Sequence, residues 1–261
     1  MPRIRIDDTE LHYEDTGQGP LLLLIHGLGS SARDWEKQVP YLSQRFRVIT
    51  FDVRGHGRSD KPPGPYSIPL FAADTAELLK VLESGPAHVV GISMGGMISF
   101  QLAVSAPELV KSLVIVNAGP EMIVRTLRER IQVFQRHLIV RILGMRKMGE
   151  VLSQRLFPKP EHAELRKAFV ERWAENDPRA YRHAMKAIVG WSVVDQLRYI
   201  RCATLVITSD EDYTPVSLKE AYVARMPNAE LSVIRDARHA VPVERPEQFN
   251  QVLLAFLLKQ E

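Results

Sequence analysis

The residues with the clearest chemical potential lie in the segment Gly91-Ile92-Ser93-Met94-Gly95-Gly96, where a serine stands between two glycines with one residue on each side. The segment follows an apolar run at 88–92 and opens an apolar helical pattern at 97–104. A serine on such a tight strand-to-helix turn can present its hydroxyl as a nucleophile. We expect side chains at positions 91 and 95 to collide with the neighbouring strand and helix. Taken alone, the segment also fits a glycine-rich turn that happens to contain serine.

Two further segments follow predicted strands and could complete a site. His26-Gly27-Leu28-Gly29 follows the apolar run 21–25, and a backbone N–H in this turn can lie over the serine. We expect oxyanion donors at the N–H groups of Leu28 and Met94, with Gly29 as the competing choice for the first. The segment 52–59 (DVRGHGRS) follows the next strand, and its Asp, Arg and His are expected to hold loops together, as is His26.

A histidine and several carboxylates occur late in the chain. His239 comes after the last predicted strand, at 231–234, and is a candidate general base. The segment 209–215 follows a predicted strand at 204–208 and offers three carboxylates, on Asp210, Glu211 and Asp212. The chain therefore contains a nucleophile, an acid and a base in the order that one fold is known to use.

With these motifs in this order, the chain resembles the α/β-hydrolase superfamily, in its esterase and enol-lactonase-like branch, over the whole core. The resemblance implies that Ser93 is the nucleophile and His239 the base. Placing Ser209 on the family's usual glycine puts the acid at Asp212, with Asp210 as the alternative. Some relatives carry the acid after the strand that precedes the cap, but Asn117 stands there and has no charge. Arg238 replaces the glycine that usually precedes the histidine.

The resemblance implies a serine hydrolase that cleaves a small to medium carboxylic ester through an acyl-enzyme. A lactonase similar to 3-oxoadipate enol-lactonase and a carbon–carbon hydrolase of aromatic catabolism are the alternatives. A ligand-binding receptor without catalysis is a more remote one. Serine in place of aspartate argues against dehalogenases and epoxide hydrolases. The expected partner is a small ester or lactone, and this chemistry requires neither a metal nor an organic cofactor.

The elements that must position these residues follow a regular pattern. Strand-like and helix-like segments alternate up to about residue 118 and again from about 203, which predicts an α/β fold with a parallel sheet between helices. Between 121 and 190 we find helical periodicity and no convincing strand. We therefore expect a core of residues 1–119 and 192–261 and a helical cap of 120–191. The resemblance makes this an eight-stranded, mostly parallel sheet with the cap after the sixth strand.

The predicted cap combines an apolar stripe with an excess of positive charge. The stripe consists of Val124, Leu127, Ile131, Phe134, Leu138, Ile142 and Met145. We expect it to be buried on the core; alternatively Ile131, Phe134 and Leu138, with Trp191, line a substrate pocket. Residues 121–159 carry a net charge of +6. This charge fits a solvated face, attraction of a carboxylate-bearing substrate, or contact with an anionic membrane. The second predicts a guanidinium pointing into the cleft beside Ser93.

The composition excludes several other classes of protein. The chain has 261 residues, of which 45% are hydrophobic and 25% charged, as in ordinary globular proteins. A net charge of +3 is too small to indicate nucleic-acid binding. No apolar run approaches the roughly 20 residues of a spanning helix, and acidic residues follow the first few positions, where a signal peptide would be apolar. A single cysteine, Cys202, excludes an intramolecular disulfide and suits the cytoplasm. A homodimer is left open.

Overall fold

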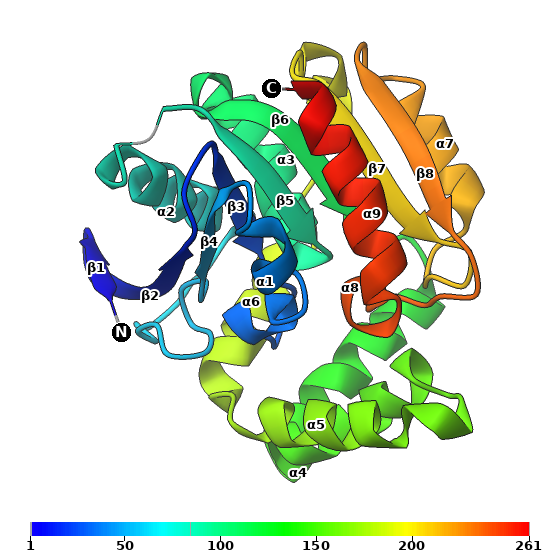
Figure 1. Cartoon of the computed structure of the whole chain (residues 1–261). Coiled ribbons are helices and arrows are strands. Elements are labelled where there is room, and N and C mark those ends of the chain that lie inside the picture. The colour runs from blue at the N-terminus through cyan, green and yellow to red at the C-terminus, as the bar shows by residue number, and fades with distance from the viewer. Residues whose placement is uncertain (1, 84, 261) are drawn as a thin grey trace.

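The computed structural model of the chain, described over residues 2–83 and 85–260, is built on one eight-stranded sheet (Figure 1). The strand order is β1-β2-β4-β3-β5-β6-β7-β8. Pairs β1–β2 and β2–β4 are antiparallel and the other five are parallel, so the predicted mostly parallel sheet is confirmed. The strands are β1 (Arg3–Ile6), β2 (Thr9–Thr16), β3 (Leu21–Ile25), β4 (Arg47–Phe51), β5 (Ala87–Ile92), β6 (Val110–Val116), β7 (Ala203–Ser209) and β8 (Ala229–Ile234).

Helices connect the strands and cover both faces of the sheet. They are α1 (Val39–Leu42), α2 (Ile68–Val81), α3 (Met94–Ser105), α4 (Leu127–Leu156), α5 (Ala163–Ala174), α6 (Pro178–Ile188), α7 (Val216–Val223), α8 (Val241–Glu244) and α9 (Pro246–Leu257). Short 3₁₀ turns are η1 (Ala32–Trp35), η2 (Pro107–Leu109), η3 (Pro160–His162), η4 (Val194–Tyr199) and η5 (Leu258–Gln260).

The central strands are apolar throughout because both of their faces are covered. All five residues of β3 and all six of β5 are buried. Alternate residues of β3 enter different cores: Leu23 packs with side chains of α2 and α3, whereas Leu22 and Leu24 pack with side chains of α9. Figure 1 shows α9 lying across one face of the sheet. This packing fixes the strand ends from which the site residues project.

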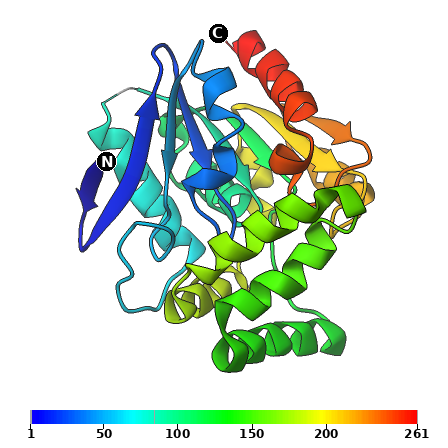
Figure 2. The same ribbon diagram turned by 60° about the horizontal axis from the view of Figure 1, so that its bottom comes forward.

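A helical insertion, here called the cap, separates β6 from η4 and consists of α4, α5 and α6 (Figures 1 and 2). Its two ends lie side by side, because Glu121 and Ser192 form an isolated bridge and Met122 N–H donates to Trp191 C=O at 2.9 Å. The chain thus leaves and re-enters the core at one place. No helix within the described residues is both long and apolar enough to cross a membrane.

The expectation that the apolar stripe of the cap is buried on the core is wrong for the first half of α4. Helix α4 is interrupted at Gly144, whose φ of 78° is not helical. On the C-terminal side of this kink, Met145 and Met148 are buried against Trp173, with Val140 from just before it. On the N-terminal side the stripe faces solvent: Ile131, Phe134 and Leu138 are 47%, 65% and 42% exposed. The kink directs this half of the helix away from the core (Figure 2).

Ile131, Phe134 and Leu138 therefore face solvent and not an enclosed cavity; Phe134 and Leu138 line an open hollow between α4 and α6, and the part of all three in a substrate pocket stays a prediction. Trp191, the fourth predicted pocket residue, is buried, and its indole N–H donates to Gln101 Oε1 at 3.0 Å. In this position Trp191 joins the cap to α3.

Candidate active site

Ser93 lies at the turn between β5 and α3, and its backbone is strained. Its φ of 55° and ψ of −117° fall outside the regions that a serine normally adopts. Two hydrogen bonds hold this conformation: Ser93 N–H donates to Val116 C=O at 3.0 Å, and Ser93 C=O accepts from Met97 N–H at 3.1 Å. Ser93 is partly exposed although its neighbours Ile92 and Met94 are buried. The turn therefore presents the hydroxyl from a fixed backbone.

The glycines beside Ser93 are required by close approach, as the sequence predicts. A Cβ at Gly91 would lie 2.2 Å from Gly95 C=O, and a Cβ at Gly95 would lie 2.2 Å from Ile25 C=O. Both contacts are far inside van der Waals distance and involve backbone, which cannot move aside easily. Strand β5, strand β3 and helix α3 can meet around Ser93 only with glycine at both positions.

The turn after β3 lies directly against Ser93. A Cβ at Gly27 would be 3.5 Å from Ser93 Cβ, which places this turn beside the nucleophile. His26 secures it, since its Nδ1 pairs with Gly27 C=O at 2.8 Å and its Nε2 accepts from Val53 N–H at 3.0 Å. Both ring nitrogens are used in holding loops, which is the role predicted for His26.

The cap closes over this turn at Gly29. A Cβ there would lie 2.8 Å from the ring of Trp173 and 2.9 Å from the ring of Tyr181. Asn176 adds a hydrogen bond from its Nδ2 to Gly29 C=O at 2.9 Å. The position of the cap and the shape of the turn that would hold an oxyanion are thus directly linked.

His239 and Asp212 form a close pair at the carboxyl end of the sheet. His239 Nδ1 lies 2.6 Å from Asp212 Oδ1, and the Asp212 side chain is only 2% exposed. Burial alone would raise the pKa of Asp212, but the hydrogen bonds and positive charges of His239 and Lys219 lower it to about 2. Tyr213 stacks on the imidazole with ring centroids 4.3 Å apart. Asp210, the alternative acid, instead accepts from Ala237 N–H at 3.4 Å.

Lys219 is a charged neighbour of Asp212 that the sequence analysis did not single out. It lies on α7 and is 1% exposed, and its Nζ donates to Asp212 Oδ2 at 2.6 Å and to Thr214 C=O at 2.7 Å. The two oxygens of Asp212 are therefore divided between His239 and Lys219. The ammonium offsets part of the negative charge that would otherwise act on the imidazole.

We expect Lys219→Met to raise the pKa of Asp212, because the hydrogen bond and the positive charge of Lys219 are among the causes that lower it. Carboxyl ¹³C NMR between pH 2 and 6 measures the shift, with Asp212→Asn to assign the resonance. Lys80→Met, which removes an exposed lysine paired with Glu77 on α2, is the control. An Asp212 pKa that stays in place would contradict this influence of Lys219.

Asn117 ties the histidine loop to the strands on either side of it. It follows β6, is 3% exposed and has a φ of 44°, a region that asparagine tolerates better than most residues. Its Nδ2 donates to Ser209 Oγ at 2.6 Å and to the carbonyls of Arg238 and His239 at 3.2 and 2.9 Å. Its Oδ1 accepts from Ser209 N–H at 2.9 Å. Asn117 thus positions the loop that carries His239.

The polar residues of segment 52–59 hold loops together, as predicted. The carboxylate of Asp52 accepts hydrogen bonds from the backbone N–H groups of Ala32 and Arg58, each at 2.7 Å. Arg54 is buried and pairs with Asp74 at 2.7 Å. Next to the histidine, the N–H of Arg238 donates to Glu244 Oε2 at 2.6 Å.

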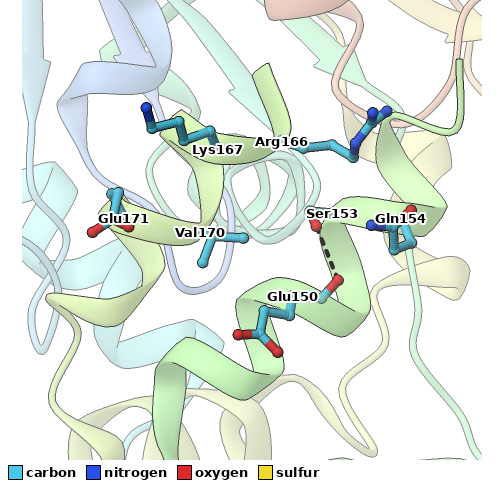
Figure 3. A pocket seen from close by; sticks show the side chains of 7 residues that line it. All are labelled: Glu150, Ser153, Gln154, Arg166, Lys167, Val170 and Glu171. Atoms are coloured by element: carbon cyan, nitrogen blue, oxygen red, sulfur yellow. Dashed lines mark hydrogen bonds between the residues drawn. The ribbon is translucent and has the colours of Figure 1, made fainter. Parts of the chain in front are cut away.

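Two hollows lie on the cap. The first, of about 220 Å³, lies between α4 and α5 (Figure 3) and is lined by Glu150, Ser153, Gln154, Arg166, Lys167, Val170 and Glu171. Its polar groups bond mostly with nearby protein atoms, as in the bond from Ser153 Oγ to Glu150 C=O at 2.9 Å. The second, of about 350 Å³, lies between α4 and α6 and is called the cationic groove below. It is lined by Phe134, His137, Leu138, Arg141, Arg179, Arg182, His183 and Lys186.

Known proteins share this architecture over nearly the whole chain. The family model for the alpha/beta hydrolase fold matches residues 20–246. The chain is 31% identical over 256 residues to (E)-2-((N-methylformamido)methylene)succinate hydrolase of Acinetobacter baylyi, covering 94% of this chain and 93% of that protein. The crystal structure of the enol-lactonase from Burkholderia xenovorans has a TM-score of 0.91 and 26% identity, covering 98% of this chain and 100% of the other. A thermophilic esterase from Thermogutta terrifontis, with malate bound, has a TM-score of 0.90 and 27% identity, covering 100% and 99%. The chain therefore belongs to the α/β-hydrolase family.

Proposed function

We propose that the chain is a serine hydrolase that cleaves small to medium carboxylic esters or lactones through an acyl-enzyme on Ser93. The observation that carries this proposal is the 2.6 Å contact between His239 Nδ1 and buried Asp212, in a loop that Asn117 ties to the sheet edge beside Ser93. With Nδ1 engaged by the carboxylate, Nε2 is the nitrogen that can accept the proton of the serine hydroxyl.

The proposed reaction has two halves. Ser93 Oγ attacks the carbonyl carbon while its proton passes to His239, and the imidazolium then protonates the departing alkoxide as the carbon–oxygen bond breaks. Water next attacks the acyl carbon and gives its proton to His239; the bond to Ser93 Oγ then breaks, the imidazolium protonates Oγ, and the acid leaves. The N–H groups of Leu28 and Met94 are our candidates for holding the oxyanion in both halves, with Gly29 as the alternative to Leu28.

The ester and the lactone differ only in whether the leaving group remains attached to the acyl group. The names of the similar proteins include an enol-lactonase and an esterase, so both classes of substrate are retained. A carbon–carbon hydrolase would use the same three side chains and stays an alternative.

Labelling with a fluorophosphonate probe tests the proposal, because the probe forms a covalent bond only with an activated serine. We expect one label per chain, mapped to Ser93 by mass spectrometry. A parallel screen of p-nitrophenyl esters of increasing chain length and a panel of lactones measures the preference. A folded chain that is neither labelled nor active would refute the enzyme and favour a ligand-binding role.

A further inference from the structure

Arg136 is a cap arginine whose guanidinium is held by Tyr181, a residue that lies against the turn beside Ser93. It lies on α4 and is partly buried, and its Nε donates to the hydroxyl of Tyr181 at 2.5 Å. The guanidinium carbon also lies 5.6 Å from the centre of the Tyr181 ring. Tyr181 is itself 1% exposed, so its buried ring holds one side of the planar Arg136 guanidinium in place.

The neighbours of Arg136 belong to both halves of the site. On one side, the Tyr181 ring lies against Gly29 in the turn beside Ser93. On the other side, Tyr213 stacks on His239. Desolvation raises the pKa of Tyr213 to about 12, and the positive charge of Arg136 opposes this rise, so the guanidinium is close enough for Tyr213 to sense it. Tyr181 thus connects Arg136 to the turn that contains Gly27 and Gly29, beside Ser93, and the charge of Arg136 also acts on Tyr213, which stacks on His239.

The charge of Arg136 is not compensated within the described residues 2–83 and 85–260. Some arginines of the cap do have carboxylate partners, as Arg146 has in Glu171 at 2.8 Å and Arg172 in Glu36 at 2.6 Å. Over the same residues, neither Nη of Arg136 has a hydrogen-bond partner and the side chain has no ion pair. The two Nη groups of a guanidinium form a fork of parallel donors. When the guanidinium is partly buried and these donors have no partner, they favour a planar anion that can accept two hydrogen bonds.

The groove next to Arg136 on the surface of the cap is positively charged, as Arg136 is. The cationic groove, formed partly by the next turns of α4, has four permanent cations in its lining (Arg141, Arg179, Arg182 and Lys186) and no carboxylate. A hollow lined by one sign of charge concentrates ligands of the opposite sign. The groove would therefore attract the kind of molecule that the fork of Arg136 can bind.

We propose that Arg136 binds an ionised carboxylate on the substrate, so that the preferred substrates are esters or lactones that carry a second, free carboxyl group. This inference rests on the proposed function and specifies its substrate class. Arg136 acts in recognition alone: Tyr181 holds its Nε, and the two Nη groups face the carboxylate as a fork. Replacing Arg136 should therefore lower kcat/KM for substrates that carry a carboxylate and leave kcat/KM for neutral substrates almost unchanged.

Pairs of substrates that differ only in charge test this role. One pair is the mono-p-nitrophenyl ester of glutaric acid against p-nitrophenyl 5-methylhexanoate. A second is a γ-butyrolactone with a carboxymethyl group against one with an isobutyl group. In Arg136→Gln we expect kcat/KM to fall about 10- to 100-fold for the acidic member, as for loss of charge-assisted hydrogen bonds. We expect less than threefold change for the neutral member, and partial recovery in Arg136→Lys, which restores charge without the fork.

Arg130→Gln is the matched control, because Arg130 is an exposed arginine on the same helix. Equal losses of kcat/KM on acidic and neutral substrates would overturn the inference and make Arg136 a packing residue.

Calorimetric titration of glutarate into Ser93→Ala, with and without Arg136→Gln, tests binding without turnover, and we expect at least tenfold weaker binding in the double variant. Equal glutarate binding would overturn the carboxylate site, whereas an unlabelled and inactive wild type would refute the proposed function alone.

Discussion

Replacing Ser93 with alanine is expected to lower kcat by about 10⁶-fold, the loss typical of removing the nucleophile from a serine hydrolase. His239 and the oxyanion donors would remain, but no acyl-enzyme could form. The measurement is the rate of p-nitrophenol release from the best ester of the screen, together with loss of fluorophosphonate labelling. Alanine keeps the same strained backbone, since Val116 C=O and Met97 N–H bond to the main chain of residue 93.

Ser105→Ala is the matched control for this variant. It makes the same substitution in α3, at an exposed serine that bonds only to Gln101 C=O within the described residues. We expect the control to keep full activity and labelling. Activity above about 1% of wild type in a correctly folded Ser93→Ala protein would mean that a different residue performs the chemistry.

The core and the turn around Ser93 could be predicted because their signals are local in the sequence. A strand covered on both faces must be continuously apolar, as 21–25 is, and a turn squeezed between a strand and a helix must use glycine, as at Gly91 and Gly95. These constraints act within a few residues. They placed the mostly parallel sheet and the insertion correctly.

The cap could not be predicted equally well because burial there depends on what lies opposite. Helical spacing shows that Ile131, Phe134 and Leu138 share a face, but not whether another element covers that face. The answer depends on the direction that the first half of α4 takes relative to the second half at the break at Gly144, where a Cβ would meet nothing within 4 Å. A glycine permits such a break in a helix but does not set its direction.

For a related reason, the sequence does not reveal Lys219 and Asn117, which influence the site by holding Asp212 and the loop of His239. Lys219 reads as an ordinary charged position of a short helix, yet it is 1% exposed and bonded to Asp212. Asn117 was considered only as a missing acid, although its amide holds the carbonyls of Arg238 and His239. An amide that both donates and accepts can bridge loops far apart in sequence, and only the folded chain brings those loops together.

Asp212→Asn is expected to lower kcat by about 10⁴-fold, because an amide neither fixes the useful tautomer of His239 nor stabilises the imidazolium. The same change should also destabilise the fold. Lys219 Nζ would lose its only carboxylate partner among the described residues while remaining buried. Removing one member of a buried ion pair typically costs about 3–5 kcal/mol. Ester hydrolysis and urea unfolding at pH 7.5 measure the two effects separately.

The pH dependence of stability gives an independent check on the same carboxylate. Its pKa is about 2 in the folded chain against 3.8 for an aspartate free of such contacts, so the folded state binds the proton less tightly than the unfolded state does. The corresponding stabilisation, about 2 kcal/mol, is complete above the unfolded value and is lost as the pH falls from about 4 to 2. Between these limits the wild type should lose stability more steeply than Asp212→Asn.

The double variant Asp212→Asn/Lys219→Met separates catalysis from folding. Removing the ammonium together with the carboxylate leaves no unpaired charge at this position, so the free energy of unfolding should return to within about 1–2 kcal/mol of wild type. Catalysis should not recover, because His239 still lacks an anionic partner. Recovery of activity along with stability would show that Asp212 supports the fold alone, and Asp210 would then be the acid to test. Recovery of stability without activity would assign the two oxygens of Asp212 to different tasks, one to the imidazole and one to Lys219.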